Sequence, residues 1–166
     1  MRIQNLEKIV INTGVGRLKQ SSSFDENIMP NMLAELAAIT GQKAQNRPAR
    51  KSIAGFKVRE GSVVGFKTTL RGKRMRDFLY RMVNVALPRV RDFRGIDPKQ
   101  IDKGGNLTIG FRDHTVFPEI LPEDSKFDFG FQVTLVPRIK DKEEAYKLYK
   151  ELGVPLQDSE DNKDNG

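Results

Sequence analysis

The chain of 166 residues is 37% hydrophobic and 31% charged, which suits one packed domain and excludes a wholly disordered protein. It contains no cysteine, so disulfides and thiolate metal sites are excluded and a reducing cytosol fits. No apolar run approaches the length of a membrane span and the first residues lack a signal-peptide core, so we expect a soluble, unexported protein without membrane contact.

The positive charge is concentrated in the middle of the chain. The formal net charge is +7 and the pI about 9.7. Residues 1–42 are neutral in sum, residues 43–94 carry a net +12, and residues 95–166 carry a net −5. Scattered surface lysines do not predict this segregation, whereas a nucleic-acid-binding surface does. The segment 47–71 combines basic residues with glycines, and we interpret it as the centre of an RNA-binding surface.

The first predicted element is a strand over residues 8–14, KIVINTG. Its alternation places two isoleucines on one face and Asn12 on the other. Two interpretations of Asn12 stay open: its side chain binds a neighbouring loop, or it is displayed on an open face of a sheet. The glycines Gly14 and Gly16 predict a tight turn, because Lys19 stands where a dinucleotide-binding loop requires a third glycine or alanine.

A helix that ends at Gly41 is predicted next. Ser23 and Glu26 have the spacing of a capping box, and Pro30 must lie in the first turn or kink the helix. Apolar residues at helical spacing are interpreted as core and not as a ligand-binding surface. These residues are Met29, Met32, Leu33, Leu36, Ala37 and Thr40.

The basic third is predicted to hold two extended segments joined by a loop. Residues 42–49 are expected to be extended, and residues 63–71 form the clearest strand. Residues 51–62 contain glycines and few core anchors, so we expect a long mobile loop or loose hairpin that orders on binding. The strand turns Val64, Phe66, Thr68 and Leu70 to one face, and Lys67, Thr69 and Arg71 to the other.

Residues 73–87 are predicted to form an amphipathic helix that Pro88 stops. Cations near its start oppose the helix macrodipole, which is tolerable if they meet phosphate. Asp92 follows within an arginine-rich segment, and we interpret it as a structural partner that fixes a turn, not as a catalytic acid. The outward cations of the helix are Lys73, Arg74, Arg76 and Arg81, and the arginines around Asp92 are Arg89, Arg91 and Arg94.

Two further strands are predicted over residues 106–112 and 127–135. The phenylalanines of the second strand suit a base-stacking platform, but their strict alternation opposite a polar face favours a place in the core. Asp141 and Glu144 predict the capped start of a last helix, which Gly153 closes.

The predicted order β-α-β-β-α-β-β-α favours an α+β two-layer sandwich: a mainly antiparallel sheet with helices packed on one face and an open polar face. Residues 1–156 are predicted to form one domain and residues 157–166 a disordered acidic tail. The single histidine, His114, is expected at the surface of a strand end without a carboxylate cluster for a metal. With no catalytic motif in the sequence, we expect no enzyme activity, no cofactor, no metal and no small-molecule substrate.

Several segments, in order, carry a resemblance to one known family: KIVINTGVG, ITGQKAQNRPARKSIAGFKVREG, TLRGKRMRDFL, LPRVRDFRGID, GNLTIG and VFPEI. Over residues 5–156 the chain resembles the bacterial-type large-subunit ribosomal protein called "L five", the 5S rRNA-binding protein of the central protuberance. The resemblance implies an antiparallel sheet backed by helices, no enzymatic activity, and a place in the large subunit of a cytoplasmic ribosome, with an organellar ribosome also compatible. The implied partners are 5S rRNA, large-subunit rRNA, peptidyl-site tRNA and a small-subunit head ribosomal protein across an intersubunit bridge.

The resemblance also implies site residues. Polar contacts to 5S rRNA on the open sheet face fall on Asn12, Gln42 and Thr69. Cations nearby are expected to add phosphate affinity and salt dependence; they are Lys67, Arg71, Arg50 and Lys51. A loop that faces tRNA falls on AGFKVREG, with Phe56, Lys57 and Arg59 as its contact residues.

Three features depart from the family pattern. Similar proteins usually carry a basic helical segment before the first strand, whereas residues 1–4 alone precede the matching region here. Arg17 stands where an acidic residue is common, and the tail after Leu156 is longer than expected. The competing hypotheses are a free-standing RNA chaperone with exposed strand aromatics, and an enzyme on a similar sandwich fold.

Overall fold

The computed structural model describes residues 2–16, 18, 22–50 and 61–158. Its centre is a five-stranded sheet in the order β2-β3-β1-β5-β4, in which every neighbouring pair is antiparallel. The strands are β1 Leu6–Gly14, β2 Gln45–Pro48, β3 Val63–Leu70, β4 Leu107–Phe111 and β5 Phe131–Pro137. The α-helices are α1 Met29–Thr40, α2 Gly72–Arg81, α3 Leu87–Arg89 and α4 Lys142–Glu151.

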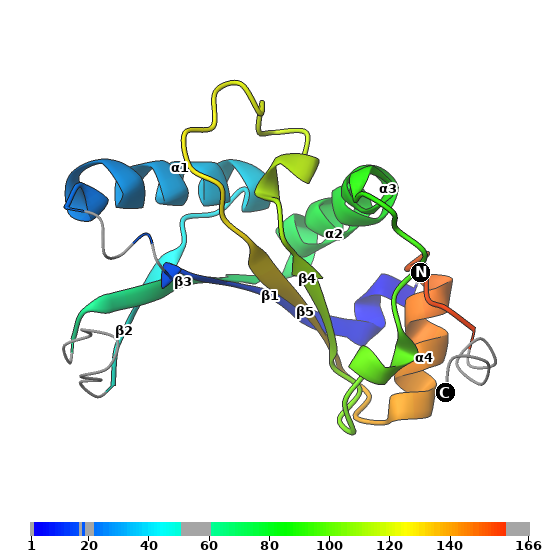
Figure 1. The fold of residues 1–166 in the computed structure, drawn as a ribbon. Helices are drawn as coiled ribbons and strands as arrows, with labels where there is room; N and C mark the ends of the chain where they lie inside the picture. Colours follow the sequence, from blue (N-terminus) through cyan, green and yellow to red (C-terminus); the bar gives the residue numbers. More distant parts are fainter. Residues whose placement is uncertain (1, 17, 19–21, 51–60, 159–166) are drawn as a thin grey trace, which may run out of the picture.

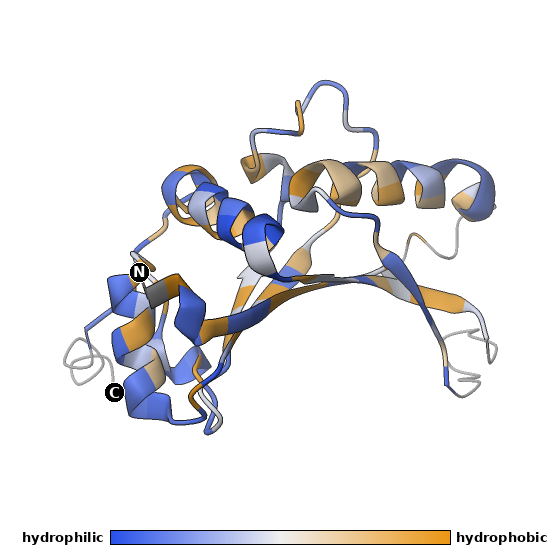
Figure 2. Ribbon diagram, turned by 180° about the vertical axis from the view of Figure 1, so that it is seen from behind, coloured by the Kyte–Doolittle hydropathy of each residue, from blue (hydrophilic) through white to orange (hydrophobic). Residues whose placement is uncertain are grey.

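The helices form a second layer on one side of the sheet. Figure 1 shows α1 and the continuous α2–α3 segment along this side, and α4 at the end of the sheet away from β2. Figure 2 shows β2 as hydrophilic along its length, which fits an edge strand whose four residues are all exposed. The predicted α+β two-layer sandwich and its order of strands and helices are confirmed.

Alternation along the strands separates a buried face from a polar one, as predicted. Phe66, Thr68 and Leu70 of β3 are buried, whereas Lys67 and Thr69 between them are half-buried. In the helix layer, Ile39 joins the buried face of α1, although the predicted stripe omitted it. The core under the helices includes Ile9, Ile11, Met32, Leu36, Phe78, Met82, Leu107, Phe117, Val133 and Leu135.

The first long helix starts with a π-helical turn, Phe24–Ile28, and continues as α1. The Met29 N–H donates to the Phe24 carbonyl, and Pro30 follows at once. Proline has no N–H and its ring clashes with the carbonyl four residues earlier in a regular α-helix, so a widened turn accommodates it. Pro30 lies in the first turn of α1, which is one of its two predicted placements. The predicted side-chain cap from Ser23 is absent, and Ser23 is engaged in other interactions.

The second long helix repeats this arrangement, because α2 passes into the π-helical turn Met82–Ala86 and Pro88 lies in α3. The prediction that Pro88 stops the helix is wrong. The wide turn accommodates the proline, and the helix continues through it and ends at Arg89. Asp92 then takes a left-handed conformation with φ 56° and forms no ion pair with the arginines of this described segment. The predicted pairing is therefore wrong, and the backbone of Asp92 itself makes the turn.

The strand β5 begins four residues later than predicted, at Phe131. Phe129 stacks instead on the ring of His114, with 3.9 Å between ring centroids. A Cβ atom at Gly130 would lie 2.7 Å from the carbonyl oxygen of Phe111, so the strand enters the sheet at a position where only glycine fits. Phe129 and Phe131 are both buried, which confirms that these aromatics belong to the core.

The helix α4 is fixed at its start and in its middle. The Asp141 carboxylate accepts hydrogen bonds from the N–H groups of Glu143 and Glu144, as predicted for the cap. The buried Tyr149 hydroxyl lies within hydrogen-bond distance of the carbonyls of Gly105 and Leu135. Burial raises the pKa of Tyr149. The hydroxyl therefore stays protonated and ties α4 to the sheet.

Two predicted regions lie mostly beyond the described residues. The loop 51–62 is described only at Gly61 and Ser62, and the tail 157–166 only at its first two residues. The Ala49 N–H donates to the Ser62 carbonyl at 2.7 Å, so β2 and β3 form a hairpin up to that point. No helix in the described ranges has the length and apolarity needed to cross a membrane.

Candidate nucleic-acid interface

The sheet face opposite α1 and α2 carries polar residues in register across the strands. Asn12 of β1 is paired with Lys67 of β3 on one side and with Gln132 of β5 on the other. Gln45 of the edge strand β2 is paired in turn with Lys67. Directly opposed residues share a face of a sheet, so these side chains form one line across four strands. We call Gln45, Lys67, Asn12 and Gln132 the polar row.

A second line of side chains runs beside the polar row; on β3, β1 and β5 its members lie two residues from those of the polar row and therefore on the same face. Thr69 is paired with Val10, Val10 with Thr134, and Thr134 with Thr108. The hydroxyl groups of Thr108 and Thr134 are 3.2 Å apart. We call Thr69, Thr134 and Thr108 the hydroxyl row; the apolar Val10 stands between Thr69 and Thr134. Together the two rows present amide, hydroxyl and ammonium groups on one surface.

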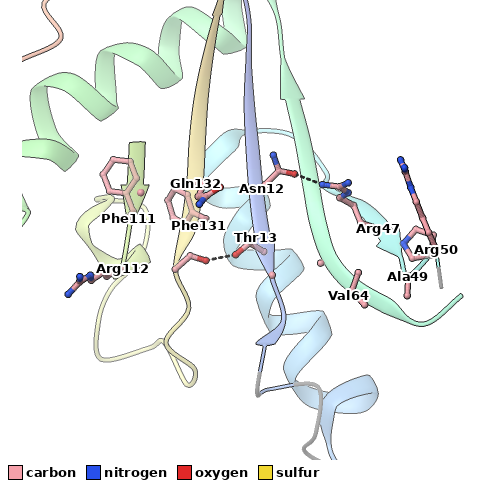
Figure 3. A pocket seen from close by; sticks show the side chains of 15 residues that line it. Asn12, Thr13, Arg47, Ala49, Arg50, Val64, Phe111, Arg112, Phe131 and Gln132 are labelled. Atoms are coloured by element: carbon pink, nitrogen blue, oxygen red, sulfur yellow. Dashed lines mark hydrogen bonds between the residues drawn. The ribbon is translucent and has the colours of Figure 1, made fainter. Parts of the chain in front are cut away.

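Asn12 lies on the open face, and its side chain bonds a residue of another strand, β2, and not of a loop. Its Oδ1 accepts a hydrogen bond from Arg47 Nη1 at 3.0 Å (Figure 3). Arg47 belongs to β2, and the side chain reaches across β3 next to Gly65, its partner in the strand register. Within the described residues the Asn12 amide nitrogen makes no hydrogen bond, so this group remains available as a donor.

The structure brings Gln42 next to Thr69. Gln42 Nε2 donates to the Thr69 carbonyl at 3.0 Å, and Gln42 Oε1 accepts from Arg74 Nη1 at 3.2 Å. Gln42 therefore bridges β3 and the first turn of α2. Arg74 joins the site although it was not among the predicted site residues; the available signal was its place among cations at a helix N-terminus.

The predicted cations do not act as one group. Lys67 stands in the polar row, and Arg50 is exposed beside β2. The Arg71 side chain is 58% exposed and lies 4.0 Å from Glu7, so an acidic neighbour already offsets its charge. Four further predicted residues lie outside the described ranges: Lys51, Phe56, Lys57 and Arg59.

A groove of about 1160 Å³ opens on the sheet near Asn12 and Gln132. Figure 3 shows Arg50 and Arg112 on its two sides. Gly110 also lines it, and a Cβ atom there would meet nothing within 4 Å. Arg112 was not predicted, because it lies in the acidic third of the sequence. Cations at the margins and amides between them suit a phosphate backbone and its sugars.

The prediction of a surface histidine is wrong, because His114 is fully buried. The single-turn helix His114–Val116 after β4 turns the ring inward, where Nε2 lies 2.7 Å from Glu35 Oε2 of α1. Nothing in the local pattern indicated this contact, because Glu35 is distant in sequence and belongs to another element.

The prediction that no carboxylates gather around the histidine is also wrong. One ring nitrogen of His114 and a carboxylate oxygen from each of Asp113 and Asp128 lie within 4.8 Å of one another. Hydrogen bonds from the Thr115 hydroxyl and N–H hold the pKa of the Asp113 carboxyl below its ordinary value, against the opposing effect of burial. Asp113 is therefore ionised at neutral pH.

Comparisons with known proteins cover nearly the whole chain. A family model described as "Ribosomal protein L5" matches residues 1–59, and a second model, for the C-terminus of the same ribosomal protein family, matches residues 63–156. The large ribosomal subunit protein uL5 of Halothermothrix orenii is 47% identical over 158 residues, which cover 94% of this chain and 85% of that protein. The uL5 protein of Rubrobacter xylanophilus is 48% identical over 156 residues, with 94% and 84% covered.

The same relationship extends to Pseudothermotoga lettingae, whose uL5 protein is 45% identical over 155 residues that cover 93% of this chain and 82% of that protein. This family is structural, RNA-binding and non-enzymatic, and its place is the large subunit of the cytoplasmic ribosome. With both halves matched and the antiparallel sandwich in place, the chain belongs to the ribosomal protein L5 family and is a structural constituent of the large ribosomal subunit.

Proposed function

We propose that this protein binds 5S rRNA and helps attach it in the central protuberance of the large subunit. The observation that carries the proposal is the sheet face opposite α1 and α2, on which the polar row and the hydroxyl row stand in register. A face of a sheet that carries amide, hydroxyl and ammonium groups, in a protein with a strongly basic central third, is suited to a polyanion with hydrogen-bonding sugars.

The chemistry of the two rows fits folded RNA. RNA is recognised through its shape, its phosphates and its 2′-hydroxyls, and by hydrogen bonds to bases in loops. The Asn12 amide nitrogen donates to a ribose or base acceptor, while the Thr69 hydroxyl can donate or accept. Lys67, which lies opposite Asn12 and two residues before Thr69 on β3, supplies charge. Specificity then comes from the neutral polar groups and affinity from the cations.

The groove extends this surface towards β4. Gly110 carries no side chain there and a Cβ atom at this position meets nothing within 4 Å, so an RNA backbone can approach the strand closely. Arg50 and Arg112 at the margins would neutralise phosphates on the two sides of the bound strand. In this proposal Gln42 acts with Arg74, and their hydrogen bond directs the guanidinium beside Thr69.

Two further contacts complete the proposal. The hairpin of β2 and β3 extends away from the helices (Figure 1), and its loop, with Phe56, Lys57 and Arg59, would contact peptidyl-site tRNA. A small-subunit head protein would be met across an intersubunit bridge. Both contacts rest on the family resemblance and on this direction of the hairpin.

The central test is equilibrium binding of the full chain to purified 5S rRNA, to tRNA and to a scrambled RNA of the same length as 5S rRNA, over a series of salt concentrations. A preference for 5S rRNA that persists as salt rises is expected, because neutral polar groups carry specificity. Equal affinities for all three RNAs, lost together as salt rises, would reduce the protein to a non-specific basic domain.

Substitutions locate the surface. Asn12→Ala is expected to cost about 1–3 kcal/mol of 5S rRNA binding if the amide pairs with RNA. Asn84→Ala is the matched control, because Asn84 is exposed in the helix layer and its amide nitrogen donates to the Tyr80 carbonyl within the same helical segment. Lys57→Ala is expected to spare 5S rRNA affinity and to weaken tRNA contact. Equal losses of 5S rRNA affinity from Asn12→Ala, Thr69→Ala and Lys57→Ala would contradict this division of roles.

A further inference from the structure

The environment of His114 differs at its two ring nitrogens. Nε2 lies 2.7 Å from Glu35 Oε2 and 3.0 Å from the Ser125 hydroxyl. Nδ1 is equally buried but makes no hydrogen bond in the part of the chain that the structure describes. Buried polar atoms normally have a partner, so a buried nitrogen without one requires an explanation. The ring is held in place, because it stacks on Phe129 at 3.9 Å between centroids.

The carboxylate of Glu35 decides which nitrogen carries the proton of a neutral imidazole. A carboxylate accepts but does not donate, so it favours the N–H on Nε2 and leaves the lone pair on Nδ1. This is the arrangement around a metal-binding histidine, which donates its other ring N–H to a carboxylate and is thereby fixed in tautomer and orientation. Glu35 is thus a positioning residue for the lone pair of Nδ1.

Two carboxylates stand near this ring. Oxygens of Asp113 and Asp128 and a ring nitrogen of His114 all lie within 4.8 Å of one another. The hydrogen bonds from Thr115 reach Asp113 at Oδ1, which leaves Oδ2 to act as a ligand. Both aspartates are exposed, so their side chains can move closer to a shared ion without disturbing the core. Two negative charges balance one divalent cation.

We propose that Asp113, His114 and Asp128 form a binding site for a divalent transition-metal ion of the zinc class, with Nδ1 as the nitrogen ligand. An imidazole with two carboxylates is a ligand set that zinc accepts, and three protein ligands leave a fourth position open. The ion would join the two ends of the connection between β4 and β5, because Asp113 lies at its start and Asp128 near its end. This role is independent of RNA binding by the sheet.

The chain contains one histidine, so its imidazole signals in ¹⁵N NMR need no assignment. Untagged full-length protein, treated with chelator, is titrated with Zn²⁺ while these signals are followed. The expected result is an Nε2–H tautomer before addition and a saturable shift of Nδ1 at one equivalent of Zn²⁺. A proton on Nδ1, or an Nδ1 signal that does not respond to Zn²⁺, would overturn the proposal.

Variants identify the other ligands, with Co²⁺ as a visible-absorbing probe in place of Zn²⁺. Asp128→Asn is expected to remove the Co²⁺ absorption at one equivalent, and Glu35→Gln to weaken Zn²⁺ affinity by about 10–100-fold. Asp124→Asn is the matched control, because Asp124 is an exposed carboxylate of the same connection outside the cluster. Retained absorption in Asp128→Asn, or the same loss in Asp124→Asn, would contradict the site. Circular dichroism of each variant shows that a loss is not caused by unfolding.

Discussion

The two faces of the sheet are built from the same strands but meet different requirements. On β3, Thr68 is 2% exposed beneath the helices, whereas Thr69, the next residue, is half-buried on the opposite face. On β5, Val133 packs in the core and Gln132 is exposed beside the groove. One residue of displacement along a strand therefore separates a packing role from a proposed binding role.

The two faces constrain the sequence in different ways. The helix-facing side needs apolar volume, which several residue types can supply. The open side needs particular side chains at fixed positions of the strand register, because the polar row exists only while Asn12 stays opposite Lys67 and Gln132. Mutations on the first face should change stability, and mutations on the second should change binding.

The largest expected effect is on the packed face. Phe78→Ala should lower the free energy of unfolding by about 3–5 kcal/mol, because Phe78 is fully buried and stacks on Phe117. Urea denaturation measures this loss. Tyr80→Ala is the control on the same helix, where the side chain is 68% exposed, and it should leave stability nearly unchanged. Similar losses from both variants would mean that α2 does not pack as described.

Two glycines test the space that the structure leaves for a Cβ atom. Gly130→Ala should lower the free energy of unfolding by about 1–3 kcal/mol, because its Cβ would meet the Phe111 carbonyl at 2.7 Å. Gly110→Ala should leave stability within about 0.5 kcal/mol, because its Cβ meets nothing within 4 Å. Gly110 lines the groove, so this variant should instead reduce 5S rRNA affinity. Unchanged affinity would exclude the groove from the RNA surface.

A pair of adjacent threonines tests the faces directly. Thr69→Val should weaken 5S rRNA binding by about 1–3 kcal/mol, because it removes a hydroxyl that we place against RNA. Thr68→Val makes the same chemical change on the buried face and should leave affinity unchanged. Filter binding and thermal unfolding, measured for both, separate the two effects. Loss of affinity in Thr68→Val alone would invert the assignment of faces.

The smallest expected effect is on how the folding stability depends on acid pH. It arises at Asp102, in a turn that belongs to neither row. Burial by itself raises the pKa of Asp102, but hydrogen bonds from the Asn106 side chain, Asn106 N–H and the Gly104 and Gly105 backbone together hold it below 3.8. A lowered pKa in the folded state stabilises the fold above pH 3.8, and this contribution is lost as pH falls through the folded-state value. Asp102→Asn should therefore flatten the decline of stability below about pH 4 in acid titrations followed by circular dichroism. An unchanged decline would show that other carboxylates dominate it.

Local patterns predicted most of the fold because strand alternation and caps are properties of neighbouring residues. The two faces of β3 and the Asp141 cap followed from spacing alone. The start of β5 did not, because it depends on Phe129 meeting a histidine from another segment. Asp92 was misread because opposite charges close in sequence need not pair in space.

For the candidate site, too, the sequence predicted the face on which a residue lies but not its distant contacts. Asn12 and Thr69 were placed on the polar side by alternation, and the structure keeps them there. The hydrogen bond from Arg47 to Asn12 joins residues 35 positions apart, and the link from Arg74 to Gln42 joins residues 32 positions apart. Such contacts are set by strand order and helix placement, which periodicity does not encode.

The two π-helical turns constrain how the chain can gain or lose residues over evolution. Each turn holds one residue more than an α-helical turn, which rotates everything after it by about 100° relative to an uninterrupted α-helix. Deletion of one residue from Met82–Ala86 would restore a regular helix and drive Pro88 against the carbonyl four residues before it. Related sequences that keep Pro88 should therefore also keep the extra residue of the turn, and the deletion should be tolerated only where the proline is lost.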